Sequence, residues 1–204
     1  MKSFRFLSFW LLLTLGTATV CGQNSATTDN GVVINGVKWA TRNVDKPGTF
    51  AENPEDPGMF YQWNRKKEWA VTGNVTGWDA TYPKGTSWVK KNDPSPAGWH
   101  VPTKDDIKKL LDASKVKAEW TMEEDVYGEK FTDKATGNSI FLPAVGVRKS
   151  NDSSEGADTE GYYWSSSESG MEFLATGLNF NNDVNPTIYS GHRKSAFSIR
   201  PVAD

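Results

Sequence analysis

Residues 98–111 contain the most constraining folding signal in this sequence, the start of an amphipathic helix. Pro102 favours an extended conformation for the residue before it, so the chain enters the segment as a strand or a straight arm. Thr103 can cap the helix with its hydroxyl, and Asp106 is placed to complete a capping box. The apolar residues recur at helical spacing, at Ile107, Leu110 and Leu111. We therefore predict a short helix that begins after Thr103 and packs one face against a core.

Six short segments carry a pattern that resembles one protein family. Residues 98–103, Gly-Trp-His-Val-Pro-Thr, are similar to its Gly-Trp-(Arg/His)-(Leu/Val)-Pro-Thr signature. The other segments are residues 34–44, 58–64, 141–144, 161–166 and 197–202. In this order they resemble the Fibrobacter succinogenes major paralogous domain, a family typical of secreted or envelope proteins of the Bacteroidetes. More distantly, the family resembles the C-type-lectin-like fold that formylglycine-generating enzymes share.

The predicted fold class is α+β, with short mixed or antiparallel sheets, one central amphipathic helix and long irregular loops. Its C-type-lectin-like character is what the resemblance implies. Asn35-Gly36 predicts a hairpin within residues 32–40. Further strands are expected at residues 59–63, 127–131, 139–142, 162–167, 174–180 and 196–202. Loops or turns are expected at residues 43–58, 69–96, 151–160 and 181–186. The loop at residues 151–160 is expected to be exposed and mobile.

Residues 1–22 have the pattern of a secretory signal peptide. Lys2 and Arg5 form a basic start, and the apolar stretch that follows is too short to span a bilayer as a helix. Two processing routes stay open. Cleavage after Gly22 would release a soluble chain that begins at Gln23, whereas lipidation of Cys21 would anchor the protein to a membrane.

Either route exports the chain, so we expect it at the cell surface, at the outer membrane, in the periplasm or secreted. The remaining sequence is divided into a short linker at residues 23–31 and a single domain at residues 32–204. The net charge of −2 argues against a nucleic-acid-binding protein, which needs a basic face. Membrane contact is predicted only through a lipid at Cys21.

Cys21 is the only cysteine of the chain. The family resemblance implies that many members carry cysteines where this sequence has Ser95 and Pro201. Since both are absent here, we infer that Ser95 and Pro201 lie close in space and that packing replaces the disulfide. Formylglycine chemistry depends on cysteine, so that activity does not transfer to this chain.

Catalysis finds little support in the residue pattern, and we predict that the protein is not an enzyme. His100 lies inside the structural signature and His192 lies in a turn-like sequence. We expect no cofactor. Calcium is the alternative, since carboxylates and amides are its ligands, and its candidate ligands are Asn179, Asn181, Asn182, Asp183 and Asn185.

The candidate ligand-binding residues lie in the irregular segment 69–96, and they are Trp69, Trp78, Tyr82 and Trp88. Long irregular segments are often functional, and exposed aromatic rings beside polar groups are typical of recognition sites. The alternative, that these rings only attach the loop to the domain, carries equal weight. We expect an exported adhesion or ligand-binding module for a glycan or a cell-surface protein. The alternatives are a structural or assembly component of the envelope or a surface appendage, and an enzyme with an unrecognised site.

Overall fold

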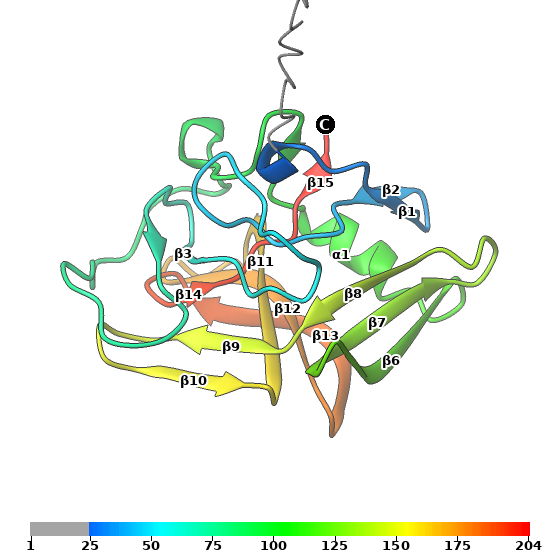
Figure 1. The fold of residues 1–204 in the computed structure, drawn as a ribbon. Coiled ribbons are helices and arrows are strands. Elements are labelled where there is room, and N and C mark those ends of the chain that lie inside the picture. Colours follow the sequence, from blue (N-terminus) through cyan, green and yellow to red (C-terminus); the bar gives the residue numbers. More distant parts are fainter. Residues whose placement is uncertain (1–24) are drawn as a thin grey trace, which may run out of the picture.

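A large β-sheet forms the centre of the computed structural model, which describes residues 25–204 (Figure 1). Its strands are β3 (Phe60–Gln62), β4 (Glu68–Trp69), β9 (Val145–Arg148), β10 (Ser154–Ala157), β11 (Glu160–Glu168), β12 (Leu174–Asn181), β13 (Val184–His192) and β14 (Ala196–Phe197). They follow the order β13-β12-β11-β9-β14-β3-β4, and β10 pairs with β9 outside this path. Neighbours are antiparallel except β11 and β9, which pair in parallel through Gly161 and Gly146.

Two smaller sheets complete the strand architecture. One has the order β1-β2-β15-β5, with β1 (Val32–Ile34), β2 (Val37–Trp39), β5 (Trp99–His100) and β15 (Val202–Ala203). The other is the meander β6 (Val116–Glu123), β7 (Val126–Asp133) and β8 (Ser139–Pro143), which Figure 1 shows on the right of the large sheet. The helical elements are α1 (Lys104–Leu110) and the short 3-10 turns η1 (Ser25–Thr27) and η2 (Lys90–Asn92).

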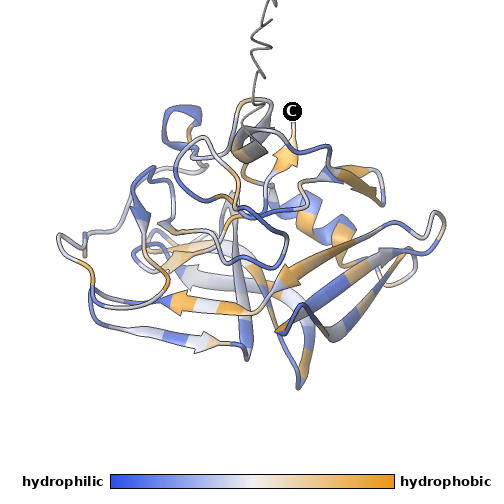
Figure 2. Cartoon of the chain, in the orientation of Figure 1, coloured by the Kyte–Doolittle hydropathy of each residue, from blue (hydrophilic) through white to orange (hydrophobic). Residues whose placement is uncertain are grey.

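Two buried clusters take opposite faces of the large sheet. Successive strand residues point to opposite faces, and in β11 Tyr163 belongs to one cluster and Trp164 to the other. The first cluster joins the sheet to α1, to β7 and β8 and to the β1–β2 hairpin. In the second, the rings of Trp164 and Phe197 stack with centroids 3.9 Å apart. Figure 2 shows apolar residues on several strands and on one side of α1, while many of the loops are hydrophilic.

The predicted helix start is confirmed. The Thr103 hydroxyl accepts a hydrogen bond from the Asp106 amide at 3.1 Å, and the Asp106 carboxylate accepts one from the Thr103 amide at 2.9 Å. This is a complete capping box. Ile107 and Leu110 are each 1 % exposed, so the apolar face is buried as its spacing indicates.

The Asn35-Gly36 hairpin is also confirmed. Ile34 pairs with Val37 across the turn. Asn35 and Gly36 have φ angles of 44° and 76°, the left-handed conformation that a two-residue turn of this kind requires.

The predicted α+β class is wrong. The described residues are mostly strand, with one α-helix and three sheets in a β-sandwich-like arrangement, so the lectin-like architecture expected from the distant resemblance is not retained. The prediction missed β4, β6, β9, β10 and β13. All of these except β9 lie at the edge of their sheet with one partner strand. β9 lies inside the large sheet, but it is short and includes Gly146 and Arg148, so its sequence gives only a weak strand signal. Edge strands face solvent, so they lack the buried apolar alternation by which strands are recognised.

The loop expected at residues 151–160 is one place where this error appears, because β10 pairs there with β9. The turn expected at residues 181–186 is shorter than predicted, since β13 begins at Val184. The strands predicted at residues 59–63, 127–131, 139–142, 162–167 and 174–180 coincide with β3, β7, β8, β11 and β12. The single strand predicted at residues 196–202 is instead two short strands, β14 and β15, which belong to different sheets.

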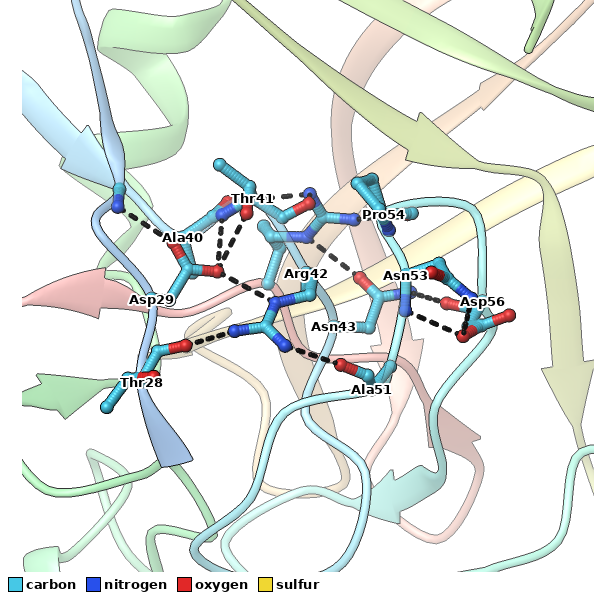
Figure 3. A network of polar contacts seen from close by, with 12 residues as sticks. Thr28, Asp29, Ala40, Thr41, Arg42, Asn43, Ala51, Asn53, Pro54 and Asp56 are labelled. Atoms are coloured by element: carbon cyan, nitrogen blue, oxygen red, sulfur yellow. Dashed lines mark hydrogen bonds and ion pairs between the residues drawn. The ribbon is translucent and has the colours of Figure 1, made fainter. Parts of the chain in front are cut away.

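The start of the described chain packs on the domain although residues 23–31 were predicted as a linker. Figure 3 shows the Asp29 carboxylate accepting hydrogen bonds from Thr41 and Arg42, while Arg42 also donates to the carbonyls of Thr28 and Ala51. The predicted signal peptide and Cys21 lie outside the described residues. Among residues 25–204, no helix combines the length and apolar character needed to cross a membrane.

The segments that contain Ser95 and Pro201 run side by side in the fold. β5, which follows Ser95, pairs with β15, which follows Pro201, through His100 and Val202. The Ser95 hydroxyl is buried without a hydrogen-bond partner among the described residues. The proximity of Ser95 and Pro201 themselves stays a prediction.

Candidate functional site

The irregular segment 69–96 is held in place by two buried arginines from the large sheet. Arg148, which is fully buried, donates to the carbonyls of Ala70 at 2.8 Å and Gly73 at 2.7 Å. Arg193 is 1 % exposed and donates to the carbonyls of Pro83 and Gly85. Burial lowers the pKa of both guanidinium groups. These contacts satisfy loop carbonyls that no strand partner reaches, so the segment is irregular but fixed.

The three candidate tryptophans of this segment do not form one exposed surface. Trp69 is 3 % exposed and lies in a cluster with half-buried Trp78, whose ring centroid is 4.8 Å away. Trp88 is 7 % exposed, belongs to a different cluster and donates its indole N–H to the Asn92 carbonyl. These contacts match the alternative in which the tryptophans attach the loop to the domain.

Tyr82 differs from the tryptophans because it is 39 % exposed and lines a hollow of about 360 Å³. The hollow, which we call the tyrosine pocket, lies where the loop meets the large sheet. Besides Tyr82, its lining includes Lys149, Tyr162, Tyr189, His192 and Lys194. Of the four candidate ligand-binding residues predicted from the sequence, Tyr82 is the one that lines this pocket.

Aromatic rings from three separate parts of the chain form the wall of the tyrosine pocket. Tyr162 of β11 meets Tyr189 of β13 at a centroid distance of 5.3 Å, and the buried ring of Phe197 supports Tyr162 from below at 5.2 Å. Tyr189 is 38 % exposed, so its ring faces solvent at the rim. Adjacent T-shaped and tilted rings of this kind give a rigid apolar wall.

A second aromatic group continues the rim beyond the pocket. Phe173 and His192 stack at 5.9 Å, and Tyr82 lies 6.2 Å from each of them. Phe173 is 44 % exposed. The result is a continuous band of exposed aromatic surface next to the hollow, of the type that marks an interaction site.

Lysines supply the polar groups of the pocket. Lys194 Nζ lies 5.3 Å from the ring centroid of Tyr82, and Lys149 Nζ pairs with the Glu155 carboxylate at 2.9 Å. The Tyr162 hydroxyl donates to the Glu160 carboxylate at 2.8 Å. Burial, followed by this hydrogen bond, raises the pKa of Tyr162, so the hydroxyl stays a neutral donor. Aromatic faces beside ammonium groups can hold a ring-shaped ligand with an anionic substituent.

Sequence reasoning missed Tyr162 and Tyr189 as site residues for different reasons. Tyr162 was placed correctly in a strand, but nothing in the sequence says which face of that strand meets Tyr82. Tyr189 lies in β13, which was not predicted. A strand followed by a tight turn usually has a partner strand, and this rule applied after residue 181 could have placed Tyr189.

Other candidate groups take ordinary structural roles. His100 Nδ1 lies 2.8 Å from the Asp204 carboxylate, at the end of the β5–β15 pair. The Asn181 side-chain oxygen, considered as a calcium ligand, accepts from the amides of Asp183 and Val184 and closes the β12–β13 turn. Within residues 25–204, no group of three or more His, Cys, Asp or Glu side chains is arranged to hold a metal ion.

One comparison with known proteins gives a match. A family model described as the Fibrobacter succinogenes major domain matches residues 21–203. No curated protein and no solved structure matches the chain. The match covers both the sheet and the tyrosine pocket, and it carries no statement about activity.

Proposed function

Since the chain belongs to the Fibrobacter succinogenes major domain family, we propose that it is an exported, non-catalytic recognition module that binds an acidic glycan in the tyrosine pocket. The observation that carries this proposal is the combination of exposed Tyr82 and Tyr189 rings with the Lys194 ammonium around one hollow. The location rests on the signal-peptide pattern of residues 1–22.

The chemistry of the wall favours a sugar as the ligand. Apolar C–H faces of a sugar ring pack on flat aromatic side chains, while its hydroxyls use hydrogen-bond donors at the rim. The volume of about 360 Å³ is at the lower end of the range for small-ligand pockets. It therefore suits one or two sugar units.

The charge of the rim favours an acidic sugar over a neutral one. Lys194 and Lys149 both line the hollow, and only Lys149 has a carboxylate partner, Glu155. The Lys194 ammonium lies against the Tyr82 ring and forms no ion pair with another residue in the described part of the chain. A sugar carboxylate can receive a charge-assisted hydrogen bond from this ammonium.

The test uses the mature chain and oligosaccharides of galacturonic acid, with oligosaccharides of galactose as the neutral counterpart. Isothermal titration calorimetry should show binding of the acidic series. Tyr189→Ala should weaken it by about tenfold or more, the loss expected for one aromatic contact. Lys194→Met should remove the preference for the acidic series.

Trp78→Ala is the matched control, because Trp78 lies in the same loop but outside the tyrosine pocket. It should leave the affinity unchanged. Failure of both oligosaccharide series to bind, or equal affinities for the parent chain and Tyr189→Ala, would reject the proposal.

A further inference from the structure

A second concave region lies at the start of β11 and the β12–β13 turn, and it is acidic. Two hollows, of about 540 Å³ and about 140 Å³, share the indole of Trp120 and the turn at residues 181–183. Together we call them the Trp120 groove. The larger hollow is also lined by Tyr127, Asp158 and Glu160, and the smaller one by Glu129. None of the described residues that line either hollow is Lys, Arg or His.

The aromatic wall of the groove is rigid. Trp120 of β6 pairs with Glu129 of β7, and Met122 pairs with Tyr127, so the side chains of these residues share one face of the meander. The Trp120 and Tyr127 rings are nearly parallel, at 11°, with centroids 6.1 Å apart. The edge contact of Trp120 with the core residue Phe180, at 6.4 Å, fixes the indole plane. Tyr127 is 45 % exposed, so the stack faces solvent.

Glu129 is the unusual residue of the groove. It is 3 % exposed and lines the smaller hollow, yet its carboxyl has no hydrogen bond and no ion pair within residues 25–204. A charged carboxyl in so enclosed a position, with no protein partner, is unfavourable for folding. Burial, and then the negative charge of Glu119, raise its pKa to about 7.

The charged groups around Glu129 offer it no cation. On β6, Glu119 pairs with Lys117 at 2.7 Å, and Lys130 of β7 bonds Glu123 at 2.9 Å. The β12–β13 turn contributes Asp183, the β10–β11 turn contributes Asp158 and the first residue of β11 is Glu160, and all three are acids. The hollow is thus shaped and charged for a cation that the described chain does not provide.

We propose that the Trp120 groove binds a lysine side chain from an extended segment of a partner protein, with the ammonium in the smaller hollow against Glu129 and the methylene stem on the Trp120 ring. Lysine side chains pack their apolar stems on such surfaces, and ammonium groups are attracted to indole faces. The smaller hollow has room for an ammonium group and a short stretch of methylene chain but not for a sugar ring.

The strands around the groove support an extended partner. β6 and β13 each lie at the edge of their sheet, with one strand partner among the described residues. A free strand edge offers amide and carbonyl groups to an extended peptide, while a side-chain pocket next to it supplies specificity. The groove shares no lining residue with the tyrosine pocket, although Glu160 of the groove accepts a hydrogen bond from Tyr162 of the pocket. The lysine peptide and the acidic oligosaccharides test the two sites separately.

The test is an NMR titration of the mature chain that follows the indole N–H of Trp120. The probe is a capped heptapeptide of glycine and serine with one central lysine, and its counterpart carries Nε-acetyllysine. The lysine peptide should shift the Trp120 signal saturably at about pH 8, and acetylation should weaken binding by about tenfold or more, since it removes the charge. Glu129→Gln should weaken binding by a similar factor.

The pH dependence separates Glu129 from the other acids of the groove. Between about pH 8 and about pH 5.5 the lysine stays charged, whereas Glu129 takes up a proton, so affinity should fall about tenfold. In Glu129→Gln this fall should be much smaller, because the carboxyl whose pKa lies in this range is gone. Asp125→Asn, in the β6–β7 turn outside both hollows, should behave as the parent chain does.

Three results would overturn the proposal. They are no change at Trp120 with the lysine peptide, equal affinities for the lysine and acetyllysine peptides, and equal affinities for the parent chain and Glu129→Gln. Tighter binding of free glucosamine than of the lysine peptide would also overturn it, in favour of an amino-sugar ligand.

Discussion

Glu129 lies in the middle of β7 with a side chain that is only 3 % exposed and has no hydrogen bond or ion pair to another of residues 25–204. Its folded-state pKa of about 7 lies above the ordinary value of 4.5. The folded state therefore holds this proton more tightly than the unfolded state does. The contribution of Glu129 to stability is most favourable below about pH 4.5 and is lost as the pH rises towards about 7.

Replacing Glu129 by glutamine, its neutral isostere, should remove this loss of stability at higher pH. We expect Glu129→Gln to unfold at a higher urea concentration than the parent chain at about pH 8. The free energy of unfolding should rise by about 2 kcal/mol. This is less than the full pKa shift implies, because the hollow admits water. The two proteins should be equally stable at about pH 4. Equal stability at both pH values would contradict the assignment, and exposed Glu52→Gln should change stability by no more than about 0.5 kcal/mol at either.

The buried arginines Arg148 and Arg193 show a second effect at this scale. The guanidinium of each arginine donates hydrogen bonds to carbonyl oxygens of the irregular segment and not to a carboxylate. Arg193 also lies over the ring of Trp63, at 4.3 Å. A single planar side chain with several donors can thus replace the backbone pairing that a loop lacks.

The helix α1 is short, so its stability depends strongly on how its ends are capped. A helix of this length gains little from propensity and depends on its cap and on Ile107 and Leu110 in the core. The capping box joins the strand-like arm before Thr103 to the helix after it. This junction sets the direction in which α1 meets the large sheet.

Loss of the cap should be measurable in isolation. Thr103→Ala removes the hydroxyl that accepts from the Asp106 amide, and we expect a loss of about 1 kcal/mol in the free energy of unfolding by chemical denaturation. Lys108→Ala is the control on the exposed face of the same helix and should cost less than about 0.5 kcal/mol. Equal losses in both variants would show that the capping box adds nothing.

The edge strands β6 and β13 explain why the two candidate sites lie where they do. Tyr189 of β13 helps to form the tyrosine pocket, and Trp120 of β6 forms the shared wall of the Trp120 groove. An edge strand has one flank and often one face free of the core, so its side chains can serve recognition without disturbing packing.

At the scale of the whole molecule, packing and buried polar contacts hold the described chain together, and its sequence has no cysteine after residue 21. The start of the described chain is tied to the domain through Asp29 and Arg42. Residues before it carry the predicted export signal. The two parts can therefore be separated by processing near residue 22 without loss of the contacts that Asp29 makes.

The predicted signal peptide should be processed during export. We expect the protein isolated from its own cells to lack the first residues, and intact mass spectrometry distinguishes the two routes. A mass that corresponds to residues 23–204 indicates cleavage after Gly22, and a larger mass with acyl chains on Cys21 indicates a lipoprotein. Cys21→Ser should move the protein from the membrane fraction to the soluble fraction only in the second case. The full-length, unmodified mass would contradict export through this leader.

The sequence by itself determined the elements that depend on near neighbours in the chain. The capping box at Thr103 and Asp106 and the turn at Asn35-Gly36 follow from local backbone chemistry. Strands buried on the core, such as β3 and β12, are visible because burial requires apolar side chains in a regular pattern. Family membership followed from the same short segments.

The fold class and the candidate sites depend on contacts between distant segments, so they became visible only in the three-dimensional structure. The strands β6, β10 and β13 exist through backbone hydrogen bonds to one partner, and such bonds leave little trace in side-chain pattern. The same holds for exposure: Trp88 is buried and Tyr82 exposed within one loop, because the side chains that cover or expose them come from distant parts of the chain. A pocket built from Tyr82, Tyr162 and Tyr189 is a property of how three segments pack, which no single segment specifies.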